Sequence, residues 1–316
     1  MKKILILHTG GTISMAEDAS GHVQLSSENP LSTPEFSDVT LVTENAFNLP
    51  SPQIGVSEML QLKNRILSAL TNENFAGVVI THGTDTLEET AYFLDATLPT
   101  DKPVVITGAM RSSNEVGTDG TYNFLSALTV AKTPSSAGRG VLVVMNGEIH
   151  LARFVTKTHT TNVSTFQTPT RGPVGLLTKN GPYYFDAPQT FPHHDISSVA
   201  GNIPIIKAYA GMSGQIFDLL PTDKLDGLVI EALGAGNLPP AAFTSLKRLL
   251  AENIPVVLTS RCFNGLAEPI YAYDGGGVKL HEAGILFARE INAQKARLKL
   301  LIGLQAHLNL KKFIEE

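Results

Sequence analysis

Short apolar runs alternate along this chain with longer amphipathic runs, and this rhythm predicts strands separated by helices. Continuous apolar stretches typical of buried strands occur at residues 4–7, 77–80, 103–107 and 140–145. Between them, apolar residues at helical spacing predict helices at residues 58–70, 86–97 and 119–131. An alternation of this kind predicts an α/β fold with a mostly parallel sheet flanked by helices on both faces.

A stretch rich in Pro, Gly and His interrupts the rhythm before it resumes. We place an interdomain linker at residues 183–203, between a larger N-terminal α/β domain (residues 1–182) and a smaller C-terminal α/β domain (residues 204–316). The later apolar pattern predicts strands at residues 205–209, 228–231 and 255–259, and helices at residues 240–251 and 292–304. A chain of 316 residues is long enough for two domains of ordinary size.

One polar segment, residues 14–34, shows neither helical nor strand periodicity. It is too long for a simple connection, and loops of that length usually have a function or are disordered. We therefore expect it to be either a functional lid or a disordered segment.

Charge and composition narrow the classes of partner. A net charge of −5 gives no overall basic field that would attract nucleic acid or an anionic membrane. No apolar run approaches the ~20 residues that span a bilayer, and the apolar stretch at residues 4–7 is too short for a signal peptide. Cys262 is the only cysteine, so no internal disulfide can form, and we expect it to be a packed thiol. A cytoplasmic protein without nucleic-acid or membrane partners is the prediction.

Candidate chemistry lies directly after two of the predicted strands. The segments TGGTI (residues 9–13) and THGTDT (residues 81–86) place threonine hydroxyls at the carboxyl ends of strands, where ligands bind in open α/β sheets. Threonines beside an acid are parts of a nucleophilic site. Each segment also has a plainer role, because Thr12 can cap a turn and Thr84 or Asp85 can cap the helix that follows. The first segment lacks the third glycine of the dinucleotide fingerprint.

Lys157 lies among threonines in the segment RFVTKTHTTN (residues 153–162). A lysine in such a strand is typically solvated, but a desolvated lysine can take the proton that a threonine nucleophile must lose. Its spacing alone leaves both roles open. No histidine pair has the spacing of metal ligands on a helix, so neither a metal nor a cofactor is predicted.

Taken together, the two segments resemble the signatures of the bacterial-type L-asparaginases. TGGTI (residues 9–13) and HGTDTLEETA (residues 82–91) are similar to the two signature segments of that family. Further matches follow in order along nearly the whole chain: KPVV (102–105), GAMR (108–111), VTKT (155–158), GNL (236–238) and QKAR (294–297). The resemblance implies a hydrolase of linear amides that converts L-asparagine to L-aspartate and ammonia through a threonine nucleophile and an acyl-enzyme intermediate.

The resemblance also implies catalytic roles by position. Thr12 corresponds to the nucleophile that attacks the amide carbon. Thr84, Asp85 and Lys157 correspond to a second cluster, in which Lys157 helps to deprotonate Thr84 or a water. Asp85 holds Lys157 and pairs with the α-ammonium group of the substrate.

Substrate-binding roles are implied in the same way. Ser51 corresponds to the residue that binds the α-carboxylate, and the backbone amides of Gly83 and Thr84 lie near that carboxylate and the oxyanion. The Ala109 carbonyl corresponds to an acceptor for the amide nitrogen, and Asn237 to a residue that reaches a neighbouring subunit's site. The family assembles as a homo-oligomer, usually a tetramer of close dimers with sites between subunits.

Three positions depart from the family pattern. Residues 14–36 contain no Tyr, although many relatives have one in the lid; Tyr271 and Tyr273 are candidates to replace it. Pro52 stands where the secreted relatives often have Gln. The acid that some relatives offer from a second subunit has no clear counterpart, and Glu268 is a candidate for it. These departures leave the selectivity between asparagine and glutamine open.

Two other functions compete with this one. A broader glutaminase-asparaginase would have the same chemistry with a wider substrate range. A non-catalytic α/β protein that binds an amino acid would use Ser51 and Asp85, but it would not need Thr12, Thr84 and Lys157 together.

Overall fold

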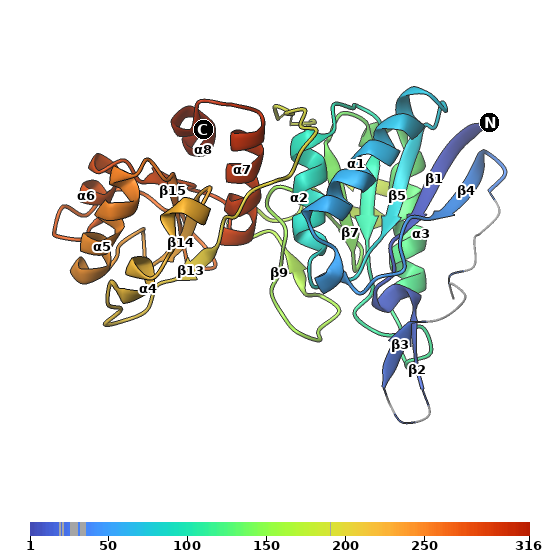
Figure 1. Cartoon of the computed structure of the whole chain (residues 1–316). Coiled ribbons are helices and arrows are strands. Elements are labelled where there is room, and N and C mark those ends of the chain that lie inside the picture. Colours follow the sequence, from blue (N-terminus) through green and yellow to red (C-terminus); the bar gives the residue numbers. More distant parts are fainter. Residues whose placement is uncertain (19, 21, 26–30, 32–35, 190) are drawn as a thin grey trace. The chain divides into compact units, whose positions relative to one another are not determined.

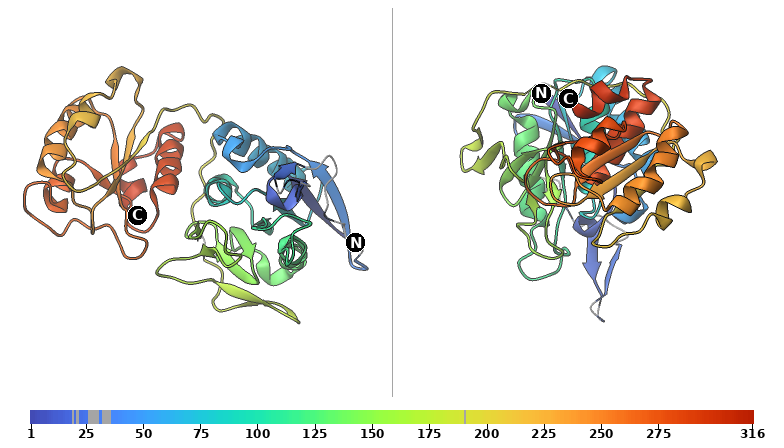
Figure 2. Two further views of the ribbon diagram at one scale, coloured as in Figure 1. Left: turned by 90° about the horizontal axis from the view of Figure 1, so that it is seen from below. Right: turned by 90° about the vertical axis from the view of Figure 1, so that its left-hand side faces the viewer.

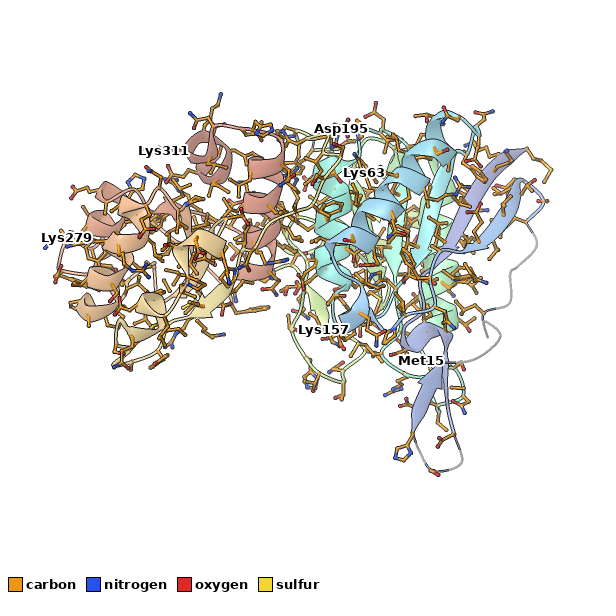
Figure 3. All side chains as sticks on the ribbon, in the orientation of Figure 1. Met15, Lys63, Lys157, Asp195, Lys279 and Lys311 are labelled. Carbon is orange, nitrogen blue, oxygen red and sulfur yellow. The ribbon has the colours of Figure 1, made fainter. Side chains whose placement is uncertain are left out.

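The computed structural model describes residues 1–18, 20, 22–25, 31, 36–189 and 191–316. The chain divides into two compact units, Met1–Asp195 and Ile196–Glu316 (Figure 1). This division falls inside the segment 183–203, whose bounds as a linker stay a prediction. At the end of the first unit, the nearly buried Lys63 ammonium contacts the Asp195 carboxylate at 2.5 Å (Figure 3).

The first unit is built on an eight-stranded sheet that is parallel over five strands. Its order is β12-β11-β8-β7-β6-β5-β1-β4. The parallel strands are β1 (Lys2–His8), β4 (Val39–Asn45), β5 (Gly77–Thr81), β6 (Val104–Thr107) and β7 (Val141–Met145). The antiparallel strands are β8 (Glu148–Leu151), β11 (Gly175–Thr178) and β12 (Gly181–Tyr184).

The change from parallel to antiparallel strands has a local cause. Asn146 and Gly147 join β7 to β8 with φ values of 52° and 78°. Two consecutive positive φ values form the tight hairpin turn that Asn-Gly favours. β8 therefore returns beside β7 instead of crossing over through a helix.

Helices cover both faces of this sheet, as the sequence predicts. α1 (Val56–Thr71) packs on α2 (Leu87–Thr97), which contacts β6 and β7 on one face, and α3 (Gly120–Lys132) packs on the other (Figure 1). Ile4 and Ile6 belong to the hydrophobic cluster of α3, whereas Leu5 between them points to the opposite face. Every residue of β5, β6 and β7 is buried, which explains their continuous apolar runs.

Several short elements lie between the main ones, at positions where the sequence predicts none. The 3₁₀ turn η1 (Thr12–Ser14) is followed by the hairpin of β2 (Met15–Glu17) and β3 (Val23–Leu25), inside the predicted lid segment. Residues 19, 21, 26–30 and 32–34 of that segment lie outside the described residues. The others are η2 (Ser51–Gln53), η3 (Pro134–Ser136) and the two-strand ladder of β9 (Thr156–Lys157) and β10 (Phe166–Gln167).

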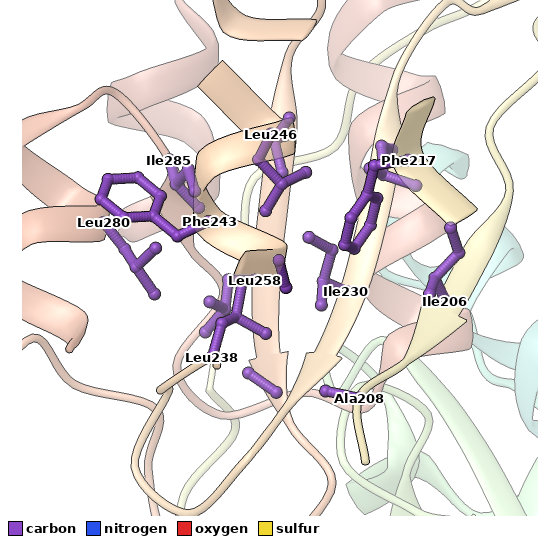
Figure 4. Close-up of a cluster of buried hydrophobic side chains, with 14 of the residues drawn as sticks. Ile206, Ala208, Phe217, Ile230, Leu238, Phe243, Leu246, Leu258, Leu280 and Ile285 are labelled. Carbon is purple, nitrogen blue, oxygen red and sulfur yellow. The ribbon is translucent and has the colours of Figure 1, made fainter. Parts of the chain in front are cut away.

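The second unit is a smaller parallel α/β unit. Its four strands are β13 (Ile205–Lys207), β14 (Leu228–Ala232), β15 (Val256–Ser260) and β16 (Leu286–Phe287). Its helices are α4 (Gln215–Asp218), α5 (Pro240–Ala251), α6 (Gly277–Glu282), α7 (Ala293–Gln305) and α8 (Leu310–Glu315), with one 3₁₀ turn, η4 (Thr222–Lys224). Phe217, Ile230, Leu246 and Leu258 meet in the core between the sheet and α4 and α5 (Figure 4). α7 packs on the other face, against β14 and β15 (Figure 2).

The structure also bears on the environment of Cys262 and on the length and apolar character of the helices. Cys262 is exposed in the stretch that follows β15, so the prediction of a packed thiol was wrong. Among the helices of the described residues, none combines the length and the apolar character that crossing a bilayer requires.

Candidate active site

The two threonine segments lie side by side because they follow neighbouring parallel strands. β1 pairs with β5 in a register that aligns His8 with Thr81, the last residue of each strand. Beyond these residues, the Thr9 amide and the Thr9 hydroxyl both donate to the Thr81 carbonyl, at 3.1 and 2.9 Å. The segments at residues 9–12 and 81–84 therefore leave the sheet together at its carboxyl edge.

Glycines bring these loops into backbone contact. Gly11 has φ 82°, and a methyl group on it would fall on the backbone of Gly83. A methyl group on Gly83 would in turn lie 2.8 Å from Cβ and Oγ of Ser51. Since only glycine permits such an approach, the loops that carry Thr12, Thr84 and Ser51 are held against one another.

Lys157 connects two of the candidate side chains. Its ammonium donates to Thr84 Oγ1 at 2.9 Å and to Asp85 Oδ1 at 2.8 Å. The lysine side chain is 16% exposed and the aspartate side chain 62% exposed, so the cluster is buried on one side and open on the other (Figure 3 shows Lys157). The structure therefore groups a hydroxyl, an amine and a carboxylate within hydrogen-bond distance.

A short hairpin holds Lys157 in place. Lys157 on β9 is opposite Phe166 on β10, and Phe166 is buried. The Thr165 carbonyl accepts from the Thr158 amide and hydroxyl, both at 2.8 Å, while the Thr165 hydroxyl donates to the His159 carbonyl at 2.6 Å. Sequence reasoning missed these supporting residues, because the turn between them carries no spacing signal.

Ser51 and the start of α2 form a group of hydrogen-bond donors. The Ser51 hydroxyl oxygen accepts from the Asp85 amide at 3.2 Å, and this leaves its own proton to donate. Within the described ranges, the amides of Gly83 and Thr84 donate to no protein group. Free amides at the N-terminal end of a helix favour an anion, so this corner suits a carboxylate or an oxyanion.

Two buried histidines lie beneath these loops and are neutral. His82 Nδ1 donates to the Gly83 carbonyl at 2.8 Å and His82 Nε2 accepts from the Thr90 hydroxyl at 3.0 Å, so one ring proton satisfies both bonds. Burial lowers the pKa of His82 to about 4, and burial also lowers the pKa of His8 to about 4. These rings support the loops without adding positive charge.

The remaining candidates fall into different units. Ala109 follows β6, and the preceding Gly108 is so close to the second loop that a methyl group on it would lie 2.6 Å from the His82 carbonyl. Asn237 lies in the second unit, where its Oδ1 accepts from the Gly277 amide at 3.1 Å. The residues that the first unit contains are Thr12, Ser51, Gly83, Thr84, Asp85, Ala109 and Lys157.

A metal centre has no counterpart in the part of the chain that the structure describes. No group of three or more His, Cys, Asp or Glu side chains there has the geometry to hold an ion. What the arrangement offers is hydroxyls, an amine, a carboxylate and free amides, which are the parts needed for acyl transfer.

Comparison with known proteins matches each of the two units to a family model. Residues 3–190 match the family model described as asparaginase, N-terminal, and residues 202–315 match the model described as glutaminase/asparaginase C-terminal domain. A probable L-asparaginase of Deinococcus radiodurans is 43% identical, over 96% of this chain and 92% of its own length. A probable periplasmic L-asparaginase of Haemophilus influenzae is 34% identical, over 96% and 89%. The crystal structure of a probable cytoplasmic L-asparaginase from Campylobacter jejuni superposes with a TM-score of 0.85 at 29% identity, covering 100% of this chain and 98% of that one.

Proposed function

With both of its units matched by asparaginase models, the chain belongs to the L-asparaginase family, and we propose that it is an L-asparaginase. It hydrolyses the side-chain amide of L-asparagine to L-aspartate and ammonia. The observation that carries this proposal is the contact of Lys157 with both Thr84 and Asp85, beside the Gly11–Gly83 contact that brings Thr12 to the same edge.

In the proposed reaction, Thr12 Oγ forms a bond to the amide carbon. The carbonyl oxygen becomes negative and is stabilised by amide donors of the neighbouring loops. When the C–N bond breaks, the nitrogen leaves as ammonia with the proton that Thr12 gave up, and the product is an acyl-enzyme. A water then attacks the acyl carbon, and the Thr12 hydroxyl is restored as aspartate leaves.

The second cluster moves protons in this scheme. At 2.9 Å, Thr84 Oγ1 and Lys157 Nζ are within the range in which a proton passes directly between two heavy atoms. Asp85 holds the ammonium at 2.8 Å and compensates its charge. We assign the deprotonation of the attacking group to Thr84 and Lys157, with Lys157 acting as the neutral amine. Thr84 Oγ1 takes the proton of that group and passes its own to Lys157 Nζ, and the ammonium so formed gives a proton to the leaving group.

The same residues fit a small zwitterion. Ser51 and the free amides of Gly83 and Thr84 receive the α-carboxylate, and the largely exposed Asp85 receives the α-ammonium group. An anion pocket and a cation pocket at a fixed separation orient the amide, and the Ala109 carbonyl accepts from its nitrogen. No cofactor and no metal is part of this scheme.

A second copy of the chain completes the site in this proposal. Asn237 and Glu268 lie on adjoining turns of the second unit, where the Glu268 amide donates to the Ala235 carbonyl at 2.7 Å. The nearby stretch exposes the apolar side chains of Phe263, Leu266, Ile270, Tyr271 and Tyr273. Exposed apolar residues in one stretch mark interaction sites, and a homo-oligomer, specifically a tetramer of close dimers, would cover them.

A broader glutaminase-asparaginase is the second candidate. Pro52 is exposed in η2 directly after Ser51, and its ring has no group to bond the α-amino nitrogen where secreted relatives often have Gln.

The cytoplasmic location stays a prediction, because the relatives include one named as probably cytoplasmic and one named as probably periplasmic.

Ammonia release from purified protein tests the proposal, with L-asparagine and L-glutamine each titrated from micromolar to tens of millimolar. Saturable release from asparagine with little from glutamine is expected, and similar rates on both would favour the second candidate. Thr12→Ala should abolish turnover while binding of asparagine stays measurable by calorimetry. If Thr12→Ala kept full turnover, the threonine mechanism would be wrong.

A further inference from the structure

The turn that carries the Ala109 carbonyl is held by two side chains of α3 and its N-cap. Asp119 accepts from the backbone amides of Met110 and Arg111, at 3.1 and 3.0 Å. The buried Asn123 amide donates both to Asp119 Oδ2 and to the Gly108 carbonyl, each at 3.0 Å. These bonds fix the backbone immediately before and after Ala109.

Because the peptide bond is planar, these hydrogen bonds also fix the direction in which the Ala109 carbonyl points. The Ala109 carbonyl and the Met110 amide belong to the same peptide, which is planar and trans, so the two bonds point in opposite directions. Because the Met110 amide points at Asp119, the Ala109 carbonyl must point away from it. Among the described residues, no donor hydrogen-bonds to the Ala109 carbonyl, although Ala109 is buried.

Asn123 also connects the clamp to the next strand. Its Oδ1 accepts from the amide of Asn146, the first residue of the β7–β8 turn, at 2.9 Å. All of its amide group is therefore used. Its side chain cannot rotate without breaking three hydrogen bonds: to Gly108 after β6, to Asn146 after β7 and to Asp119 at the start of α3. A buried polar network that is fully satisfied fixes one conformation.

We propose that Asp119 and Asn123 are positioning residues that aim the Ala109 carbonyl at the nitrogen of the scissile amide. This inference rests on the proposed asparaginase function and concerns its leaving group. The carbonyl accepts an N–H of the amide and so fixes the orientation of the nitrogen when the C–N bond breaks. Neither side chain has to touch the substrate.

The test compares two substrates that differ in that N–H. L-Asparagine offers an N–H to the Ala109 carbonyl, whereas the β-methyl ester of L-aspartate has no hydrogen on its leaving oxygen. Asp119→Asn and Asn123→Leu should lower kcat for asparagine by about ten- to a hundredfold, the loss that misplacement of a reacting group by about 1 Å produces. Hydrolysis of the ester should change less than about threefold, and KM for asparagine should change little, because Ser51 and Asp85 are untouched.

The controls separate this inference from the proposed function. Glu115→Gln changes a carboxylate of the same loop, which pairs with the Arg111 side chain at 3.5 Å and with no other described residue. This variant should hydrolyse both substrates at unchanged rates. Thr12→Ala should abolish turnover of both substrates. If it does not, the proposed function is wrong, and the positioning role of Asp119 and Asn123 is a separate question. Equal loss of amide and ester turnover in the Asp119 and Asn123 variants, or no loss of either, would overturn the positioning role.

Discussion

At position 157, one ammonium group lies within hydrogen-bond distance of a hydroxyl and a carboxylate. Thr84 is buried, whereas the Asp85 side chain is 62% exposed, and an ion pair with such an open carboxylate contributes little to stability. The role that we propose for Lys157 is therefore chemical, because its Nζ lies 2.9 Å from Thr84 Oγ1 and 2.8 Å from Asp85 Oδ1.

Replacing Lys157 by an apolar side chain of similar length should separate its effect on turnover from its effect on stability. Lys157→Met is expected to lower kcat for asparagine by about two orders of magnitude or more, the range of general acid–base contributions, with the thermal midpoint nearly unchanged. Lys132→Met is the matched control, since the Lys132 ammonium makes surface contacts, with the exposed Asp38 at 3.3 Å and over the Phe36 ring at 4.5 Å. Near-normal turnover in the Lys157 variant would exclude it from proton transfer.

The buried histidines lead to a prediction about pH and stability. The pKa of His82 is near 4 in the folded chain and 6.5 as its ordinary value, so between these pH values the unfolded chain binds a proton that the folded chain does not. The free energy of unfolding must therefore fall as the pH falls through this window, by about 3 kcal/mol for His82 at 1.36 kcal/mol per pKa unit. Above pH 6.5 the contribution is complete.

Urea unfolding near pH 7.5 and near pH 4.5 measures this dependence. His82→Gln cannot take up a proton, yet its amide can still donate to Gly83 and accept from Thr90. The drop in urea midpoint between the two pH values should be smaller for this variant than for the natural chain. An identical drop in both proteins would show that His82 does not carry the effect.

At the scale of elements, the site depends on how closely loops approach at the carboxyl edge of the sheet. β1 and β5 deliver the segments after His8 and Thr81 to the same place, but strand pairing alone leaves room for side chains between them. Gly11 and Gly83 remove that room. The close approach of the loops that carry Thr12 and Thr84 therefore depends on two residues that have no side chain.

A methyl group at Gly11 should test this arrangement. Gly11→Ala adds backbone strain at φ 82° and also displaces the Gly83 backbone, so we expect at least about a hundredfold loss of kcat. Gly172→Ala isolates the strain, because Gly172 has φ 80° and nothing within 4 Å of the added methyl group. This control should lose about 1–2 kcal/mol of stability and keep its activity. Equal activity in the two variants would mean that the loop contact is not needed.

At the scale of the whole molecule, the proposal divides one site between two copies of the chain. Thr12 and Lys157 belong to the first unit, whereas Asn237 belongs to the second. If Asn237 serves the site of a neighbouring copy, each site takes Thr12 from one chain and Asn237 from the other. A chain with a defective Thr12 and a chain with a defective Asn237 can then form one intact site between them.

Refolding Thr12→Ala together with Asn237→Ala should restore activity. In a mixed dimer one site receives both defects and the other receives none, so random pairing gives roughly a quarter of the natural activity. Thr12→Ala mixed with Lys157→Met is the control, because both changes lie in the first unit and every site keeps one defect. If the first mixture stays inactive while its dimers form normally, the site is not shared in this way.

The sequence determined the parts of the fold that burial on two faces imposes. Strands such as β5 and β7 are continuously apolar because helices cover both sides of them, and α5 was predicted at residues 240–251, as it is found, because its apolar face packs on one sheet. The two threonine segments likewise indicate the family through their residue identities alone. Pairs such as β9 and β10 could not be predicted, because two residues are too few to form a pattern.

Only the tertiary structure decided which groups meet. Lys157 and Thr84, which are 73 positions apart in the sequence, form a hydrogen bond. Asp119 accepts from backbone amides in the turn at Ala109, and side-chain identities in the sequence do not indicate such a contact. These contacts depend on strand register and on glycines that let loops touch, and both are properties of the folded sheet. The amino-acid sequence thus specifies the reactive groups, while the folded sheet determines the distances at which those groups can act.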